Sequence, residues 1–156
     1  MIRHHTRARF ALQGLRQDHG EIRELFHEYE AHPSEDREPR EKLFRQIRSL
    51  VLIHCALEED IVFPTLRRLG TERASRVLDE SRQGHGRLWK LMADLEQLDR
   101  RHPLFDARMG LFRKAWEEYA ARESVTLFEE VRGMSPEARQ ALRTELQRRR
   151  VHWLKP

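Results

Sequence analysis

Six side chains able to bind a metal ion interrupt the apolar stripes of this 156-residue chain. They are His19, His54, Glu58, His85, Tyr119 and Glu123. His54 and Glu58 are four residues apart, which puts both on one face of a helix. A buried carboxylate without a partner is costly, and it usually takes up a proton or finds a cation. The pattern therefore favours a metal site of imidazole and carboxylate ligands, which suit iron, manganese or zinc.

The segments that must position these residues are predicted to be helices. Turn signals divide the chain at four places: 32–39, 70–71, 102–103 and 133–136. Between them, apolar residues recur with a period near 3.6 and do not alternate as in a strand. Ser135 followed by Pro136 is typical of a helix start. We therefore expect an all-α, up-down-up-down antiparallel four-helix bundle, with a short fifth helix over residues 136–150 packed on its outside.

The same pattern predicts the depth of the candidate ligands. The three histidines and Tyr119 each lie 14–18 residues from the turns that connect their helices. At about 1.5 Å of rise per residue, this is roughly 20–25 Å from each turn, so antiparallel helices bring them to one height. A lone inward histidine is more often a hydrogen-bonded core residue than a ligand. So many potential ligands in one layer instead predict a site for two metals, built from facing helices.

Charge is distributed unevenly along the chain. The formal net charge is +4, but residues 1–9 carry +3, residues 10–137 carry −4 and residues 138–156 carry +5. A nucleic-acid-binding protein is expected to carry a basic face on the fold itself, so a nucleic-acid partner is not expected here. We expect a basic N-terminal arm over 1–9, the bundle over 10–133, and a basic C-terminal helix and tail over 134–156 that could dock an acidic protein partner.

Composition argues against several protein classes. No apolar run approaches the roughly 18 residues of a membrane span, and the N-terminus lacks the apolar core of a signal peptide. The single cysteine, Cys55, excludes an internal disulfide, so we expect a cytoplasmic protein without membrane partners.

Cys55 follows His54 directly, and each helical residue turns the chain by about 100°. We therefore expect Cys55 to point about 100° away from His54 around the helix and to be a structural residue, with a redox-active thiol as the alternative.

The motifs around the six positions resemble those of the hemerythrin-like family, the HHE cation-binding domains. That family has His, then His-x3-Glu, then His, then His-x3-Glu, with one motif per helix. Here the motifs read Asp18-His19, His54-Cys-Ala-Leu-Glu58, Gly84-His85-Gly86 and Tyr119-Ala-Ala-Arg-Glu123. The flanking segments 25–30 and 103–107 resemble bacterial members, and the resemblance covers about residues 10–150.

The resemblance implies a fold, a cofactor and a range of functions. By it, iron ligands would be His19, His54, Glu58, His85 and Glu123. Glu58 and Glu123 would bridge two non-heme irons that oxide or hydroxide also bridges. Such a centre binds or reacts with dioxygen, peroxide or nitric oxide. Members serve in oxygen carriage, iron or redox sensing, peroxide removal and repair of iron centres, so the resemblance leaves open whether the chain is an enzyme of the di-iron oxidase or peroxidase type.

Tyr119 stands where the family has its last histidine, and three interpretations are open. Tyr119 could ligate ferric iron as a phenolate, because a metal lowers the pKa of its ligands. It could instead donate a hydrogen bond beside an iron with an open position. Or it fills space where the second metal is lost.

The last interpretation would make the chain a degraded module with one metal or none that acts through its surface. In that case, removal of residues 138–156 would abolish partner binding. For a di-iron protein, we expect the same truncation to leave metal content and spectrum unchanged.

Overall fold

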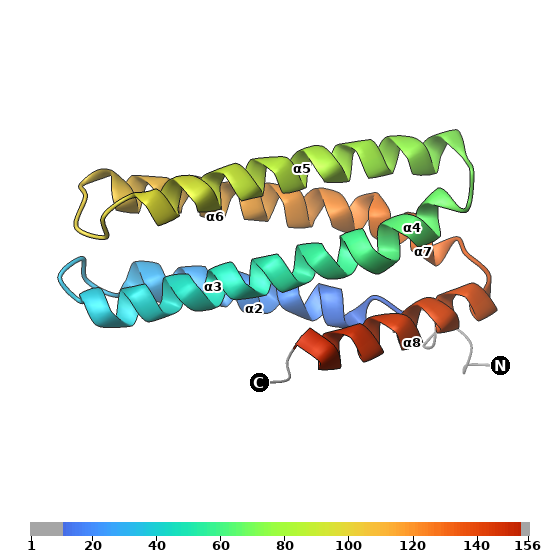
Figure 1. Ribbon diagram of the computed structural model, residues 1–156, viewed down its shortest axis with the longest axis horizontal. Helices are drawn as coiled ribbons and strands as arrows, with labels where there is room; N and C mark the ends of the chain where they lie inside the picture. The colour runs from blue at the N-terminus through green and yellow to red at the C-terminus, as the bar shows by residue number, and fades with distance from the viewer. Residues whose placement is uncertain (1–10, 154–156) are drawn as a thin grey trace.

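The computed structural model describes residues 11–153, and every regular element in that range is helical. In chain order these are α2 (Gln13–Ala31), α3 (Arg37–Leu57), the π-helical η1 (Glu58–Val62), α4 (Phe63–Arg67), α5 (Glu72–Gln97), α6 (Leu104–Val125), α7 (Leu127–Arg132) and α8 (Pro136–Trp153) (Figure 1). The predicted N-terminal arm over 1–9 lies outside the described residues. Within residues 11–153, no helix has both the length and the apolar character that crossing a membrane requires.

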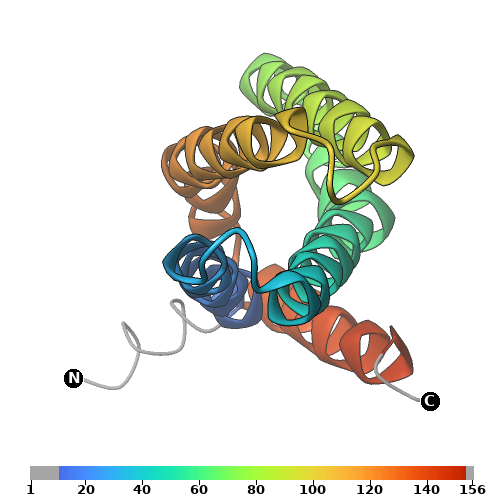
Figure 2. The same cartoon turned by 90° about the vertical axis from the view of Figure 1, so that its left-hand side faces the viewer.

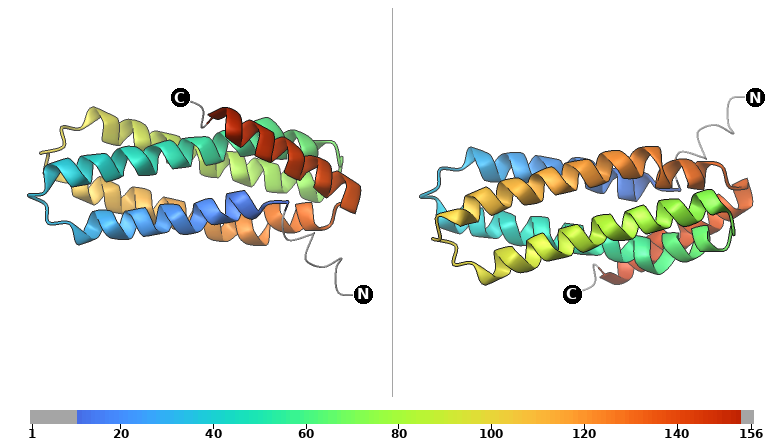
Figure 3. Two further views of the ribbon diagram at one scale, coloured as in Figure 1. Left: turned by 90° about the horizontal axis from the view of Figure 1, so that it is seen from below. Right: turned by 90° about the horizontal axis from the view of Figure 1, so that it is seen from above.

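Four antiparallel arms run along the long axis of the molecule. They are α2, then α3 continued by η1 and α4, then α5, then α6 continued by α7. Seen end-on in Figure 2, α2 lies diagonally across from α5, and α3 lies across from α6. Helix α8 packs outside this ring against α3 and η1 (Figure 3). The predicted all-α, up-down-up-down bundle with a C-terminal fifth helix is therefore confirmed.

Hydroxyl side chains define the start of two helices. Thr71 Oγ1 accepts a hydrogen bond from the backbone N–H of Ala74 at 3.1 Å, at the start of α5. Ser135 Oγ accepts one from Ala138 N–H at 3.2 Å, as its sequence position before Pro136 predicts. These bonds satisfy backbone donors that have no partner within the first helical turn.

The second arm is not a uniform α-helix. The N–H of Phe63 bonds to the carbonyl of Glu58, five residues earlier, and the turn between them is π-helical. Pro64 explains this irregularity. A proline inside an α-helix has no N–H to donate, and its ring collides with the carbonyl four residues earlier. A π turn widens the helix at that point, and here it begins at a candidate metal ligand, Glu58.

The fourth arm bends at Thr126, between α6 and α7. Thr126 has φ −119° and ψ −76°, far from ideal α-helical values, and its hydroxyl donates to the carbonyl of Arg122 at 2.8 Å. Bonds of this kind from a threonine to the preceding turn tend to bend helices. The bend falls three residues after Glu123, so the ligand-bearing turn stays α-helical.

Two apolar clusters fill the bundle on either side of its middle. One lies toward the α2–α3 and α5–α6 loops and includes Phe26, Phe44, Phe105 and Phe112. The other lies toward α4 and α7 and includes Leu57, Phe63, Leu66, Leu127 and Phe128, with Leu142 and Leu146 from α8. Because α8 contributes buried leucines, it covers the second cluster and is part of the folded domain.

A close approach between α5 and α6 occurs at Gly84. A Cβ atom at Gly84 would lie 2.5 Å from Cδ2 and 2.9 Å from Cε2 of Tyr119. An aromatic ring cannot bend away as the end of a flexible side chain does, so only glycine leaves room for this ring. At Gly86, two residues later, a Cβ would meet nothing within 4 Å.

We expect Gly84→Ala to lower the free energy of unfolding and Gly86→Ala to raise it. Alanine gains up to about 1 kcal/mol over glycine in a helix, but overpacking against a ring costs about 1–3 kcal/mol. Urea unfolding of both variants measures the difference. Tyr119→Ala combined with Gly84→Ala is the control. Compared with Tyr119→Ala alone, the double variant should be more stable, because no ring is left for the alanine to collide with. Equal stabilisation by both single alanines would contradict the close approach.

Candidate metal centre

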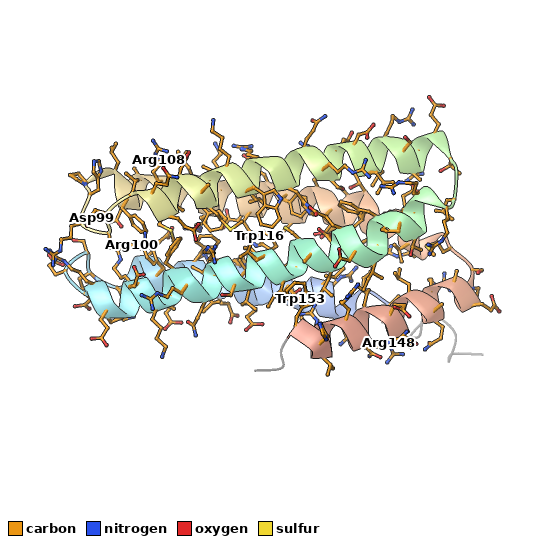
Figure 4. The ribbon with its side chains drawn as sticks, viewed as in Figure 1. Asp99, Arg100, Arg108, Trp116, Arg148 and Trp153 are labelled. Carbon is orange, nitrogen blue, oxygen red and sulfur yellow. The ribbon has the colours of Figure 1, made fainter. Side chains whose placement is uncertain are left out.

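All six side chains predicted from the sequence meet at mid-length in the bundle. They come from α2 (His19), α3 and η1 (His54, Glu58), α5 (His85) and α6 (Tyr119, Glu123). Trp116, labelled in Figure 4, marks their depth, since its ring centroid lies 5.7 Å from that of His19 and 5.2 Å from that of His54. The structure therefore brings together the layer that the spacing of the helices predicts.

One half of the cluster joins α2, α3 and α6. His19 Nε2 lies 2.6 Å from Glu123 Oε2, and His54 Nε2 lies 3.3 Å from the same oxygen. One ligand atom from each of these three residues lies within 4.8 Å of the others, an arrangement that could hold a metal ion.

The other half joins η1, α5 and α6. Tyr119 donates its hydroxyl proton to Glu58 Oε2 at 2.5 Å. His85 Nε2 lies 2.7 Å from the same carboxylate oxygen and 2.8 Å from the Tyr119 hydroxyl. The two halves meet where His54 Nε2 lies 3.6 Å from Glu58 Oε1.

Two carboxylate oxygens in this cluster lack partners. Glu58 is 0% exposed and Glu123 is 1% exposed. Glu58 Oε1 and Glu123 Oε1 are buried, and neither has a hydrogen-bond partner among the described residues. Such a group costs about 1–3 kcal/mol when it is left unsatisfied, and a cation would satisfy both oxygens at once. The imidazole, carboxylate and phenol donors thus fit a bound metal.

The two carboxylates have opposite pKa shifts. Burial raises the pKa of Glu123 well above its usual value, and repulsion from Glu58 adds to the effect. Burial also opposes ionisation of Glu58, but the positive charge of His54 and hydrogen bonds outweigh it and hold the Glu58 pKa well below its usual value. Without a cation, the buried pair therefore shares one proton between its two carboxylates.

The histidines of α2 and α3 differ in protonation. Burial, together with the positive charge of His54, lowers the pKa of His19 to about 3. His54 is also buried, but the charges of Glu123 and Glu58 outweigh this cost and raise the His54 pKa well above its usual value. A metal ion would take the place of the His54 proton between the two carboxylates.

Carboxylates bind the Nδ1 atoms of two of the histidines and so orient their rings. His54 Nδ1 donates to Asp18 Oδ2 at 3.0 Å, and His85 Nδ1 donates to Glu59 Oε1 at 2.6 Å. Metal-binding histidines commonly donate their second ring N–H to a carboxylate in this way, which leaves the other nitrogen for the metal. Asp18 precedes His19 in the sequence motif and Glu59 follows Glu58, but the sequence analysis predicts no such role for Asp18.

Arg150 of α8 holds Asp18 in place. Its two terminal nitrogens donate to Asp18 Oδ1 at 2.9 Å and Oδ2 at 2.8 Å. Burial of Asp18 opposes its ionisation, but the bonds from His54 and Arg150 outweigh this and lower the Asp18 pKa. The guanidinium passes beside Gly14, where a Cβ would lie 3.3 Å from it. Because α8 reaches the cluster through this contact, removal of residues 138–156 is no longer expected to leave the metal site unchanged.

Cys55 is buried in the apolar core, and it also lies beside two of the candidate ligands. Its sulfur, a ring nitrogen of His85 and a carboxylate oxygen of Glu58 all lie within 4.8 Å of one another. Cys55 points away from the face of His54, but it is three residues before Glu58, and that spacing also places two side chains on neighbouring positions of a helix surface. This spacing is the sequence signal for the position of Cys55 beside Glu58.

A pocket of about 300 Å³ opens between α5 and α6 beside the cluster. Its lining includes Gly84, Tyr119 and Glu123, and its rim carries charged residues of both signs, among them Arg87 and Glu118. Tyr119 and Glu123 are thus the cluster residues nearest to solvent on this side.

Comparisons with known proteins agree with this geometry. The model of the Hemerythrin HHE cation binding domain matches residues 11–144. The fold is similar to the crystal structure of a Hemerythrin HHE cation binding domain-containing protein from Mycobacterium kansasii, with a TM-score of 0.76 and 19% identity over 89% of this chain and 83% of that one. A search of curated proteins finds no match. Since the family model spans most of the sequence, the chain belongs to the hemerythrin family of HHE cation-binding domains.

Proposed function

We propose that the chain is a non-heme di-iron protein whose central cluster binds or reacts with dioxygen, peroxide or nitric oxide. The ligands in this proposal are His19, His54, Glu58, His85 and Glu123, with Tyr119 as a phenolate ligand or a hydrogen-bond donor. The observation that carries the proposal is the pair of buried carboxylate oxygens without partners, on Glu58 and Glu123, between the three imidazoles.

The donor set supports two cation positions. His19, His54 and Glu123 supply one group of ligand atoms, and Glu58 and His85 belong to another. The contact of 3.6 Å between His54 Nε2 and Glu58 Oε1 joins the two groups, so a carboxylate can reach both positions. Carboxylates from facing helices that bridge paired metals are a known solution in helical bundles, and they favour iron or manganese.

Side chains around the cluster suit the chemistry of a small oxidising ligand. Bound iron would supply one-electron chemistry and open coordination positions for dioxygen, peroxide or nitric oxide. The rings of Trp116, Phe128 and Phe63 lie against the histidines and exclude water from that side. The Tyr119 hydroxyl can donate a hydrogen bond or a proton beside such a ligand.

The pocket between α5 and α6 supports entry of a small ligand. Its volume of about 300 Å³ exceeds what a diatomic molecule or peroxide needs, and Tyr119 and Glu123 line it. Gly84 lies in the same wall, so the residue that makes room for Tyr119 also keeps this path free of a side chain.

The first test is to load the metal-free protein with ferrous iron without oxygen, remove excess metal and count iron per chain. We expect two irons. We also expect higher thermal stability, because a ligand that binds only the folded state adds about 2.7 kcal/mol when its free concentration is about 100 times the Kd. Glu58→Gln and Glu123→Gln should each lower the count. One iron or none in the unaltered protein would instead favour a degraded module that acts through its surface.

Admission of air to the loaded protein tests the role of Tyr119. If the phenolate binds ferric iron, we expect a broad visible band that Tyr119→Phe abolishes. Tyr29→Phe is a matched control, because Tyr29 is the other tyrosine of the chain and bonds to Asp106 at the far end of the bundle. A band that survives Tyr119→Phe would make Tyr119 a hydrogen-bond donor beside the metal.

Arg150→Gln should weaken iron binding although Arg150 touches no ligand. Loss of the bonds to Asp18 leaves His54 less firmly oriented, and changes to such supporting groups cost about 10–100-fold in metal affinity. Arg149→Gln is the control, since Arg149 is exposed and makes a long surface ion pair with Asp60, at 3.9 Å. Competition with a chelator measures both affinities, and equal values for the two variants would contradict a role for Arg150.

A further inference from the structure

Cys55 is a buried thiol that the proposed di-iron function does not use. It is 0% exposed and lies near the end of α3, one turn before Glu58. Its sulfur belongs to a group of three potential ligand atoms with Glu58 and His85, all within 4.8 Å of one another. One side of Cys55 packs in the apolar core, and its sulfur also has a carboxylate and an imidazole beside it.

Glu58, which shares this group with Cys55, has one carboxylate oxygen without a partner in the described part of the chain. Its Oε2 atom accepts the Tyr119 hydroxyl, but its Oε1 atom is buried and has no hydrogen-bond partner among residues 11–153. His54 Nε2 lies 3.6 Å from Oε1, so this oxygen faces the interior of the cluster and not solvent. A buried, unpartnered carboxylate oxygen is the kind of atom that a metal ion satisfies.

The two halves of the cluster differ in their supply of nitrogen ligands. His19 and His54 provide two imidazoles on the side of Glu123. On the side of Glu58 there is one, His85, because Tyr119 occupies the position of the second. A metal held only by Glu58 and His85 would have few protein ligands, and a thiolate from Cys55 would supply the missing donor.

We propose that Cys55 is a thiolate ligand of the second metal position, where it forms a sulfur, oxygen and nitrogen site with Glu58 and His85. This inference rests on the proposed function, because it takes the cluster to bind metal. Binding breaks the S–H bond, forms a metal–sulfur bond and releases the proton to solvent, with no change of oxidation state. Sulfur, nitrogen and oxygen donors together suit Zn²⁺, Co²⁺ or Fe²⁺. The two positions of the cluster are then chemically unlike, and only one of them carries sulfur.

Cobalt titration of the full-length, metal-free protein tests this assignment without any assay of activity. Thiolate bound to Co²⁺ gives a charge-transfer band in the near ultraviolet, which imidazole and carboxylate ligands do not give. We expect the unaltered protein to show this band. Cys55→Ser should abolish this band and lower the affinity for one cobalt ion at least tenfold, while the other cobalt ion binds as before.

Three controls make the result decisive. Cys55→Ala serves beside Cys55→Ser, because a buried hydroxyl without a partner could itself disturb the fold. Tyr119→Phe should keep the band, which separates sulfur ligation from phenolate ligation. Circular dichroism and thermal unfolding of each metal-free variant establish that it is folded.

Each outcome decides for or against Cys55. Two bound cobalts with no near-ultraviolet band, or a band that survives in both Cys55 variants, would overturn the thiolate assignment and leave the di-iron proposal standing. No cobalt and no iron bound by the unaltered protein would overturn both. One cobalt with a band that Cys55→Ser removes would support sulfur ligation but contradict the two-metal proposal.

Discussion

The rest of the structure depends on the burial of two glutamates, Glu58 and Glu123, in the middle of a four-helix bundle. Two carboxylates taken out of water repel each other. Without compensation, the free energy that their burial costs is large compared with the free energy of unfolding of a small domain. Three histidines face the pair, and the pKa of Glu123 is raised while that of Glu58 is lowered, so one proton remains. The apolar clusters on either side exclude the water that would otherwise solvate the charges. A stable fold without metal thus has to hold a proton where a cation would fit.

The supports behind the histidines make the two halves of the centre unequal. His54 is anchored through Asp18 to Arg150, and Asp18 is 4% exposed, so this chain of bonds lies largely inside the protein. His85 is held by Glu59, which is exposed. The orientation of His54 therefore depends on a mostly buried ion pair, and that of His85 on a carboxylate at the surface. The pocket between α5 and α6 borders both halves, since Tyr119 of one and Glu123 of the other line it.

Sequence predicted the layer of ligands because helix rise is constant and the turns are marked by proline and glycine. It did not predict the features that depend on contacts between distant residues. Arg150 and Asp18 are 132 positions apart, and no local pattern connects them. The need for glycine at position 84 comes from the ring of Tyr119, 35 positions later, which lies against it. The π turn that begins at Glu58 and precedes Pro64 was not predicted from the sequence either.

Tyr119 stands where the family's ligand pattern has a histidine, and Gly84 and Cys55 lie on the same side of the cluster. A phenol is larger than an imidazole, so it requires the glycine on the neighbouring helix, and the space it takes lies in the wall of the pocket. A neutral imidazole binds a cation without loss of a proton, whereas a phenol or a thiol must first release one. Burial and the negative charges of the glutamates raise the pKa values of both Tyr119 and Cys55, so that cost is large in the absence of metal. The half that contains them should then load later and release its metal more readily, while the two imidazoles of the other half keep the first ion in place.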